Sequence, residues 1–303
     1  MQMKKSVPRT VSVLAITIAI FYLIFTKIDF FSVVKVLSHA NLFYLFIALL
    51  LLVIGVLIIA KRWQTLLDTM GYNFQYNECF NLIMAAFPLI SITPSKSGDV
   101  IKAYYLKDKI PASKTVGSVI TERMFDVLTL VLFSLIGMTF CKKYELVFIA
   151  LIILICIIVL FLLVRAGFDF HLPIKSSWNE KIQNLILSTK LLTKDKKAFL
   201  FILSYSILIW FISIIQTVMF FYALGINVPL LFTMANIPIA IFIGLVPVTL
   251  GGMGTRDAAI IFLFSEYATS SELLGVGILF SVFRYWLISL VGIPFMRKMM
   301  KQI

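Results

Sequence analysis

The sequence has few of the residues that bind metal ions or form disulfides. Among its 303 residues are three cysteines and two histidines. The cysteines Cys79, Cys141 and Cys156 form no CxxC pair, so neither a disulfide framework nor a metal cluster is predicted. The histidines, His39 and His171, lie apart in predicted loops, and we interpret them as ordinary loop residues. We therefore expect no metal and no other cofactor.

Common enzyme motifs are also missing. The sequence contains no HExxH, no GxSxG, no Walker loop and no glycine-rich dinucleotide turn. Asp126 belongs to no DxD pair, and the adjacent Ser95 and Lys96 have the wrong spacing for a Ser-x-x-Lys nucleophile. We assign no catalytic residue, and a membrane transferase becomes the weaker alternative.

Charged residues are scarce and mostly basic. They make up 14% of the chain, whereas 61% of its residues are hydrophobic, against roughly 45–50% in soluble domains. Mean hydropathy is +1.03, so the sequence predicts one integral membrane domain over residues 1–303. The net charge of +13 suits basic loops that face an anionic leaflet. A nucleic-acid partner is not expected, because no soluble domain could present a basic face.

The apolar runs predict an all-α, polytopic membrane protein. A spanning helix needs about 20 apolar residues. Lys4, Lys5 and Arg9 precede the first run like the start of a signal peptide, but no small-residue cleavage site follows, so we expect a retained span. Six full spans are predicted: Thr10–Thr26, Leu42–Ala60, Thr115–Phe140, Leu146–Val164, Ala198–Tyr222 and Glu272–Met296.

Two further apolar regions, 78–107 and 228–266, are interrupted by proline, glycine and charge. The interruptions fall at Phe87–Asp99 and Gly244–Asp257. Each half-segment is short for a full crossing, so we expect two re-entrant helical hairpins. Irregular backbone survives at membrane depth only when it is buried in protein or lines a wet cavity. Paired interruptions in the two halves of a chain point to the binding site of a transporter.

Loop charge predicts the orientation of these elements. Basic residues place both termini, the loop after the second span, the first hairpin and the segment 165–197 on the cytoplasmic side of the cytoplasmic membrane. The uncharged turn at Gly225–Pro229 suits the outside. The two hairpins would then enter from opposite faces, as in an inverted repeat. Lys27 and Lys35 in the first outer loop run against this assignment, which we keep because Asp29 is close to them.

The segment 176–197 is polar enough to leave the membrane. Its apolar residues, including Trp178, Leu185 and Leu192, fall near helical spacing. We interpret it as an amphipathic helix on the cytoplasmic surface, or as a packed connector.

Each interruption is followed by a short predicted half-helix, Val100–Leu106 or Arg256–Phe264. Helix N-termini offer unpaired N–H groups and a partial positive charge, which suits an anion. Lys96 and Lys102 could add charge at the first site and Arg256 at the second, where its planar fork suits phosphate. The alternative is that proline and glycine only permit tight hairpin packing.

A second set of charges lies near the start of the third span. Glu122 and Asp126 share a helix face, with Arg123 beside them. Because charge inside a membrane is costly, such residues point to function. They could pair with Lys102 or Arg256, relay protons, or form an interior salt bridge that locks the helices. Arg284 in the last span has no acidic neighbour within a helical turn, so its partner must come from another helix or from an anionic ligand.

These residues carry a resemblance to the family of lysylphosphatidylglycerol synthase transmembrane regions, the flippase-like integral membrane proteins. The family shows Pro-x-x-x-Gly-Glu-x-x-Arg, then Glu-Arg-x-x-Asp, and later Gly-Gly-x-Gly-x-Arg-Glu. At Asp99 and Asp257 this chain has aspartate where the family has glutamate, so the carboxylate stands on a shorter side chain. At Lys102 it has lysine where the family has arginine, and lysine cannot form paired hydrogen bonds as a guanidinium does. The matching residues are Pro94, Gly98, Asp99, Lys102, Glu122, Arg123, Asp126, Gly251, Gly252, Gly254, Arg256 and Asp257.

The resemblance implies a role in moving lipid across the bilayer, since the membrane part of the aminoacyl-lipid proteins is associated with that step. Other relatives are linked to envelope glycan or polyprenyl-phosphate pathways. We expect a stand-alone membrane part, without aminoacyl transfer, that binds an anionic phospholipid or a polyprenyl-phosphate-linked precursor. A transferase or its accessory subunit in envelope lipid modification is the alternative, and self-association is left open. Besides the matching residues, Lys96, Thr255 and Arg284 complete the predicted binding set.

Overall fold

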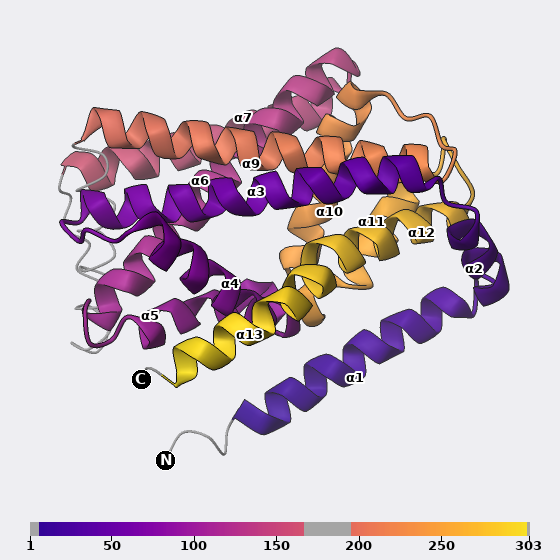
Figure 1. The fold of residues 1–303 in the computed structure, drawn as a ribbon. Helices are drawn as coiled ribbons and strands as arrows, with labels where there is room; N and C mark the ends of the chain where they lie inside the picture. Colours follow the sequence, from indigo (N-terminus) through magenta and orange to yellow (C-terminus); the bar gives the residue numbers. More distant parts are fainter. Residues whose placement is uncertain (1–5, 167–194, 302–303) are drawn as a thin grey trace.

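The computed structural model describes residues 6–166 and 195–301, and every regular element in these ranges is helical. The amphipathic helix expected over 176–197 lies outside the described residues except for its last three positions. The long helices lie roughly along one direction, with α2 at the end of the bundle away from both termini (Figure 1). The all-α expectation is therefore confirmed for the described part of the chain.

Within residues 6–166 and 195–301, four helices are long and apolar enough to cross a membrane, against the six full spans expected. They are α3 (Leu42–Thr69), the Tyr144–Leu163 part of α7 (Tyr144–Ala166), α9 (Lys196–Ala223) and the continuous run Ser270–Met300, which comprises α12 (Ser270–Ser281), η4 (Val282–Leu287) and α13 (Ile288–Met300). The first expected span, Thr10–Thr26, corresponds to α1 (Ser6–Phe25). The Leu14–Phe25 part of α1 meets α2 (Phe30–Ser38) at 87°, and the two would give a fifth span if counted as one. The expected Thr115–Phe140 span corresponds to α6 (Ala112–Phe140), which has 29 residues.

Polar caps set the start of several long helices. The Asp29 carboxylate accepts hydrogen bonds from the backbone N–H groups of Phe31 and Ser32 at the start of α2. Asn41 and Asp195 act in the same way at the first turns of α3 and α9. Such caps satisfy N–H groups that have no partner within the helix. The apolar helices therefore begin where the sequence supplies an acceptor.

The two interrupted regions form broken helices, as their proline and glycine content suggests. The first consists of α4 (Tyr76–Ile92), η2 (Pro94–Val100) and α5 (Ile101–Tyr105). The second consists of α10 (Leu230–Leu245), η3 (Leu250–Gly252) and α11 (Thr255–Leu263). The expected half-helix at Val100–Leu106 is shorter, because its beginning is 3₁₀-helical. The expected half-helix at Arg256–Phe264 is displaced by one residue.

The broken helices pack in a reciprocal pattern. α3 lies along α9, α4 lies against α13, and α10 lies against α6, so each broken helix packs on the long helix that follows the other (Figure 1). η2 and η3 contact each other. A Cβ atom at Gly251 would lie 3.1 Å from the Ser91 carbonyl oxygen, which places the two breaks side by side. The interrupted segments of the two halves thus meet inside the bundle.

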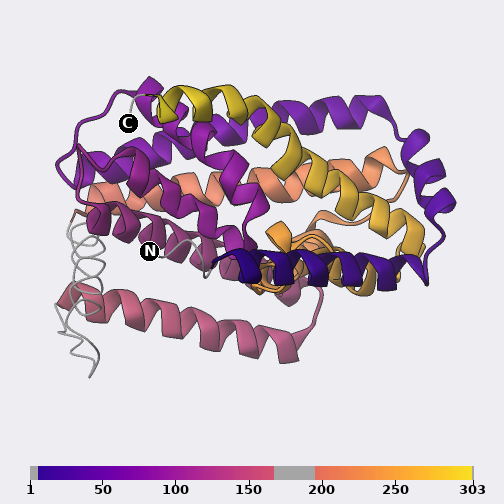
Figure 2. The ribbon, with the colours of Figure 1, turned by 90° about the horizontal axis from the view of Figure 1, so that it is seen from below.

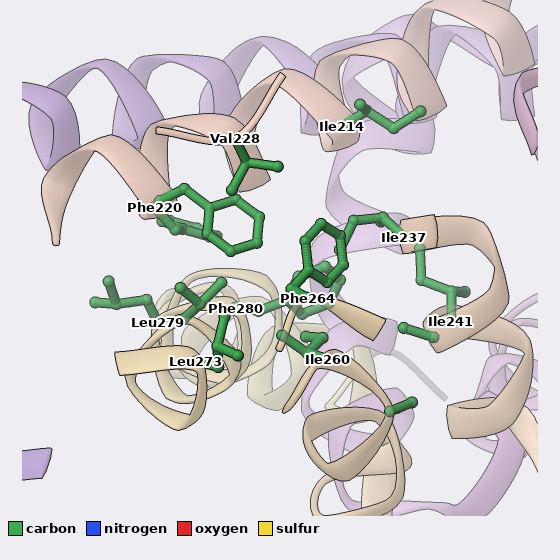
Figure 3. Packing of buried hydrophobic residues seen from close by; sticks show 14 of the residues in the cluster. Ile214, Phe220, Val228, Ile237, Ile241, Ile260, Phe264, Leu273, Leu279 and Phe280 are labelled. Atoms are coloured by element: carbon green, nitrogen blue, oxygen red, sulfur yellow. The ribbon is translucent and has the colours of Figure 1, made fainter. Parts of the chain in front are cut away.

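The largest apolar core fills the half of the bundle around α9, α10, α11 and α12. It includes Phe220, Phe264 and Phe280, which lie together in Figure 3. By contrast, α7 lies on the outside of the bundle (Figure 2), with Phe148, Ile155 and other apolar side chains exposed. An apolar outer surface of this kind suits contact with lipid tails, so the chain folds as an integral membrane protein.

Candidate functional site

A buried ion-pair network joins α3, α6 and α9. Arg62 donates from Nη2 to Glu122 Oε1, and from Nη1 to Asp126 Oδ1 at 2.6 Å and to Ser206 Oγ at 2.8 Å. The Arg62 side chain is 2% exposed. Trp210 Nε1 also donates to Asp126 Oδ1, at 2.9 Å. One arginine therefore bridges two carboxylates that stand one turn apart on α6.

Lys102 extends the network to the first broken helix. Its Nζ lies 2.7 Å from Asp99 Oδ1 and 3.3 Å from Glu122 Oε2. The same ammonium stands 4.2 Å from the centroid of the Trp63 ring. The expected pairing of Glu122 with Lys102 is present. Asp99 forms ion pairs with Lys102 and Arg123 and does not act as a simple helix cap.

Arg123 is the partly exposed member of the network. Its Nη2 donates to Asp99 Oδ2 at 2.8 Å, and its Nη1 lies 3.0 Å from Asp126 Oδ2. The side chain is 36% exposed, whereas those of Asp99 and Asp126 are 2% and 7% exposed. This first group, made of Arg62, Lys102, Arg123, Asp99, Glu122 and Asp126, thus contains three cations and three carboxylates, and Arg123 is its most exposed member.

Arg256 heads a second buried group. Its Nη2 lies 2.6 Å from Asp257 Oδ1 and donates to Ser281 Oγ at 2.6 Å. Asp257 Oδ2 accepts from the Gly254 N–H at 2.9 Å, so a carboxylate of the chain itself occupies the N-terminus of α11. The expected pairing of Arg256 with Glu122 or Asp126 is not found. The arginine instead binds its sequence neighbour.

Arg284 lies on η4, a π-helical turn within the last long helix. Its Nη1 donates to Gln216 Oε1 at 3.4 Å, and its guanidinium carbon lies 5.8 Å from the Trp210 ring and 5.5 Å from the Phe280 ring. Among the described residues, no carboxylate lies within ion-pair distance of it. π-Helical turns are frequent at functional sites. We expected a partner for Arg284 either on another helix or in an anionic ligand. The other helix, α9, supplies the uncharged amide of Gln216.

One cavity connects these side chains. It has a volume of about 80 Å³ and lies between α3, α4, α6, α9 and the last long helix. The charged residues that line it are Arg62, Asp99, Lys102, Glu122, Arg123, Asp126 and Arg284. A smaller cavity of about 10 Å³ shares Trp210, Arg284 and Tyr285 with it and reaches Arg256. The polar groups of the two broken helices thus line two neighbouring cavities that have Arg284 in common.

The glycines of both motifs lie in close backbone contacts. A Cβ at Gly98 would collide with the Leu89 carbonyl, and one at Gly252 would lie 2.5 Å from the Gly244 carbonyl oxygen. Gly251, Gly252 and Gly254 have φ values of 55°, 77° and 88°, a region that favours glycine. These contacts favour the packing alternative for the glycines. The candidate site is therefore built from side chains.

The remaining predicted residues lie near the breaks. Pro94 begins η2. Thr255 Oγ1 lies 3.0 Å from Thr249 Oγ1 and donates to the Gly252 carbonyl at 3.3 Å, which ties η3 to α11. The side chain of Lys96 lies outside the described part of the structure.

Sequence reasoning missed three residues that shape the cavity. They are Arg62, which in the sequence contributes only to the basic charge of the loop expected after the second span, and Trp210 and Gln216, which carry no signal of their own. The expected second span ends at Ala60, whereas α3 continues past Arg62 to Thr69. A basic residue inside a helix, and not after it, needs a partner in a membrane.

Apolar outer helices and a charged inner cavity define a polytopic membrane protein with a buried polar site. Its similarity to known proteins identifies the family. The model of the family described as lysylphosphatidylglycerol synthase TM region matches residues 11–292, so the chain belongs to that family.

Relatives of similar length occur in archaea. A UPF0104 membrane protein of Methanocaldococcus jannaschii is 24% identical, with 88% of this chain and 87% of the relative covered. A UPF0104 membrane protein of Pyrococcus horikoshii is 26% identical, with 86% and 88% covered. One of Archaeoglobus fulgidus is 24% identical, with 89% of each chain covered. The likeness extends over almost the whole fold.

Proposed function

We propose that this protein binds the anionic headgroup of a lipid or lipid-linked precursor and moves it across the cytoplasmic membrane. The supporting observation is the charge of the cavity between α3, α4, α6, α9 and the last long helix. Four cations and three carboxylates line it, and Arg284 is the cation without a carboxylate partner in the described structure. An uncompensated cation in a low-dielectric interior favours an anionic ligand.

The headgroup would enter beside Arg123 and reach Arg284. Arg123 is the partly exposed member of the network, and Arg284 lines the same cavity beside Gln216 and Trp210. Both guanidinium groups can form paired hydrogen bonds with phosphate oxygens. Acyl or prenyl chains would stay in the lipid outside the helices. The polar group alone would then cross through the protein.

The reciprocal packing of the broken helices suits alternating access. We infer that α4–α5 and α10–α11 are re-entrant hairpins that enter from opposite faces, as the halves of an inverted repeat. Each packs on the long helix that follows the other, and the breaks meet beside the cavity. Movement of one half against the other could open the site to either side. Both termini would lie on the cytoplasmic side.

The transferase alternative would need a carboxylate that is free to act on a headgroup. Asp99, Glu122 and Asp126 each contact at least two cationic side chains. This pairing suits a structural and electrostatic role better than base catalysis. Reconstituted protein that chemically alters a lipid would support the transferase instead.

Transport by purified protein in liposomes tests the proposal. Fluorescent phosphatidylglycerol and a fluorescent polyprenyl phosphate would be placed in both leaflets, and an impermeant quencher would report movement between them. We expect movement of at least one of these lipids, with the rate reduced tenfold or more in Arg284→Gln. Lys109→Gln is the control, because Lys109 forms an exposed pair with Glu78. Liposomes in which neither lipid moves would contradict the proposal.

The lipid that copurifies with the protein gives an independent measurement. Mass spectrometry of the bound lipid should find an anionic headgroup enriched over the membrane average, and less of it in Arg284→Gln. A bound population with the composition of the bulk membrane would count against a specific site.

A further inference from the structure

The small cavity near the second break is lined by two arginines and no carboxylate. Arg256 and Arg284 both line it, and their guanidinium carbons lie 4.3 Å and 5.5 Å from the centroid of the same Phe280 ring. The other side chains of its lining are apolar or aromatic, including Ile241, Leu245 and Trp210. Two like charges therefore face one space in an apolar surrounding.

The balance of charge differs between the two buried groups. The first group is neutral, because Arg62, Lys102 and Arg123 are matched by Asp99, Glu122 and Asp126. In the second, Asp257 pairs with Arg256, and Arg284 has no carboxylate within ion-pair distance among the described residues. The excess is one positive charge, and an unmatched charge in a low-dielectric interior is costly.

An unused hydrogen-bond donor lies at the same place. Arg256 is 2% exposed, yet its Nη1 has no hydrogen-bond partner among the described residues. Buried donors without partners are rare in folded proteins. A bound water would accept hydrogen bonds from the arginines but would leave the excess charge in place.

We propose that the small cavity binds one chloride ion between Arg256 and Arg284. A monovalent anion would neutralise the excess charge and accept hydrogen bonds from both guanidinium groups. The volume of about 10 Å³ has room for about one water-sized particle, which suits a monatomic ion better than the larger phosphate. The ion would hold the second broken helix, through Arg256, against the last long helix, through Arg284.

Thermal unfolding of the full-length protein in detergent, without added lipid, tests this site. Sodium chloride is compared with sodium gluconate at constant ionic strength. We expect a saturable rise of several degrees in Tm with chloride, as for any ligand that binds only the folded state. Arg284→Gln should lose this rise, and Lys109→Gln should keep it. Equal Tm values in both salts, or a rise that persists in Arg284→Gln, would overturn the proposal.

Two further arms make the result specific. Sodium phosphate should give no saturable rise, and an effect equal to that of chloride would overturn the assignment to the small cavity. Crystals of the wild-type protein grown in bromide should show an anomalous peak between Arg256 and Arg284, and a map without that peak would overturn the proposal even if Arg284→Gln fails to fold. The chloride ion would occupy Arg284 only while no headgroup is bound there, so the headgroup would displace it during transport. Because no lipid is present in this test, a negative result leaves the proposed transport function untouched.

Discussion

At the scale of single residues, the protein keeps its buried charges by pairing almost all of them. Arg62, Lys102 and Arg256 are each nearly inaccessible, and each contacts at least one carboxylate. Replacing a whole buried pair by apolar residues can be neutral, but removing one member leaves a charge without compensation. The effect of a substitution on stability therefore depends on whether it leaves a buried charge without a partner.

Arg62→Ala should destabilise the protein strongly. It removes the bridge between Glu122 and Asp126 and leaves two buried carboxylates close together. We expect a loss of about 3–5 kcal/mol in the free energy of unfolding. Unfolding in mixed detergent and denaturant would measure it. Lys109→Ala is the control, with a change of about 0–1 kcal/mol, because its pair with Glu78 is exposed. Equal effects of the two substitutions would contradict the burial argument.

Arg256 calls for a double-variant test. Arg256→Ala leaves Asp257 buried and unpaired, so this single variant should lose stability as well as transport. Adding Asp257→Asn removes the unpaired charge and keeps an acceptor for the Gly254 N–H. We expect the double variant to regain part of the lost stability but not the transport. A double variant less stable than Arg256→Ala would show that the pair is not the main interaction.

At the scale of helices and their contacts, close packing of broken against long helices positions the cavity. Gly137 of α6 lies against the backbone of α10, and Gly292 of α13 lies against the Met84 carbonyl of α4. Small residues let helices approach closely where both are surrounded by lipid. The glycines inside the breaks have a second role, since Gly252 and Gly254 adopt positive φ. A side chain would strain them in any surroundings.

Gly137→Ala and Gly55→Ala form a matched pair for this argument. At Gly137 a Cβ would lie 2.6 Å from the Leu231 carbonyl oxygen of α10, whereas at Gly55 its nearest neighbour is Ile212 at 3.9 Å. We expect Gly137→Ala to cost about 1–3 kcal/mol through overpacking. Gly55→Ala should gain about 0.5–1 kcal/mol from helix propensity. Unfolding of both variants under one condition measures the difference, and a stabilised Gly137→Ala would refute the close approach.

At the scale of the whole molecule, α2 lies at one end of the bundle and both termini lie toward the other (Figure 1). Lys27 precedes α2, and Lys107 follows α5 at the end near the C-terminus; both are exposed. A membrane around the apolar helices would place these two residues on opposite sides. The charge of Lys27 and Lys35, which conflicted with the orientation drawn from the loops, would then lie outside.

Cysteine labelling of intact cells tests this orientation. In a background with Cys79, Cys141 and Cys156 replaced by alanine, an impermeant maleimide should label Lys27→Cys from outside and leave Lys107→Cys unlabelled. Permeabilised cells should label both, which controls for reactivity. Labelling of both variants from outside, or of Lys107→Cys alone, would reject the proposed orientation.

Several of the residues that line the cavity could be singled out from the sequence. Gly98, Asp99, Lys102 and the Glu122-Arg123-x-x-Asp126 cluster stand out because charge and broken backbone are costly among apolar residues. The pairing of Glu122 with Lys102 was among the alternatives. The role of Arg62 was not predictable, since its partners lie about 60 residues away on another helix. Contacts of that kind depend on how helices rotate and pack, which periodicity does not specify.

The sequence by itself determined that this chain is a helical membrane protein of its family, because apolar runs, their breaks and their charges are local properties. Only the tertiary structure decided that the two breaks meet, that three carboxylates are matched by three cations, and that Arg284 faces the cavity without a carboxylate among the described residues. The physical reason is that a charge in an apolar interior is stabilised mainly by the side chain of opposite charge that packs beside it. That partner is set by the arrangement of helices distant in the chain.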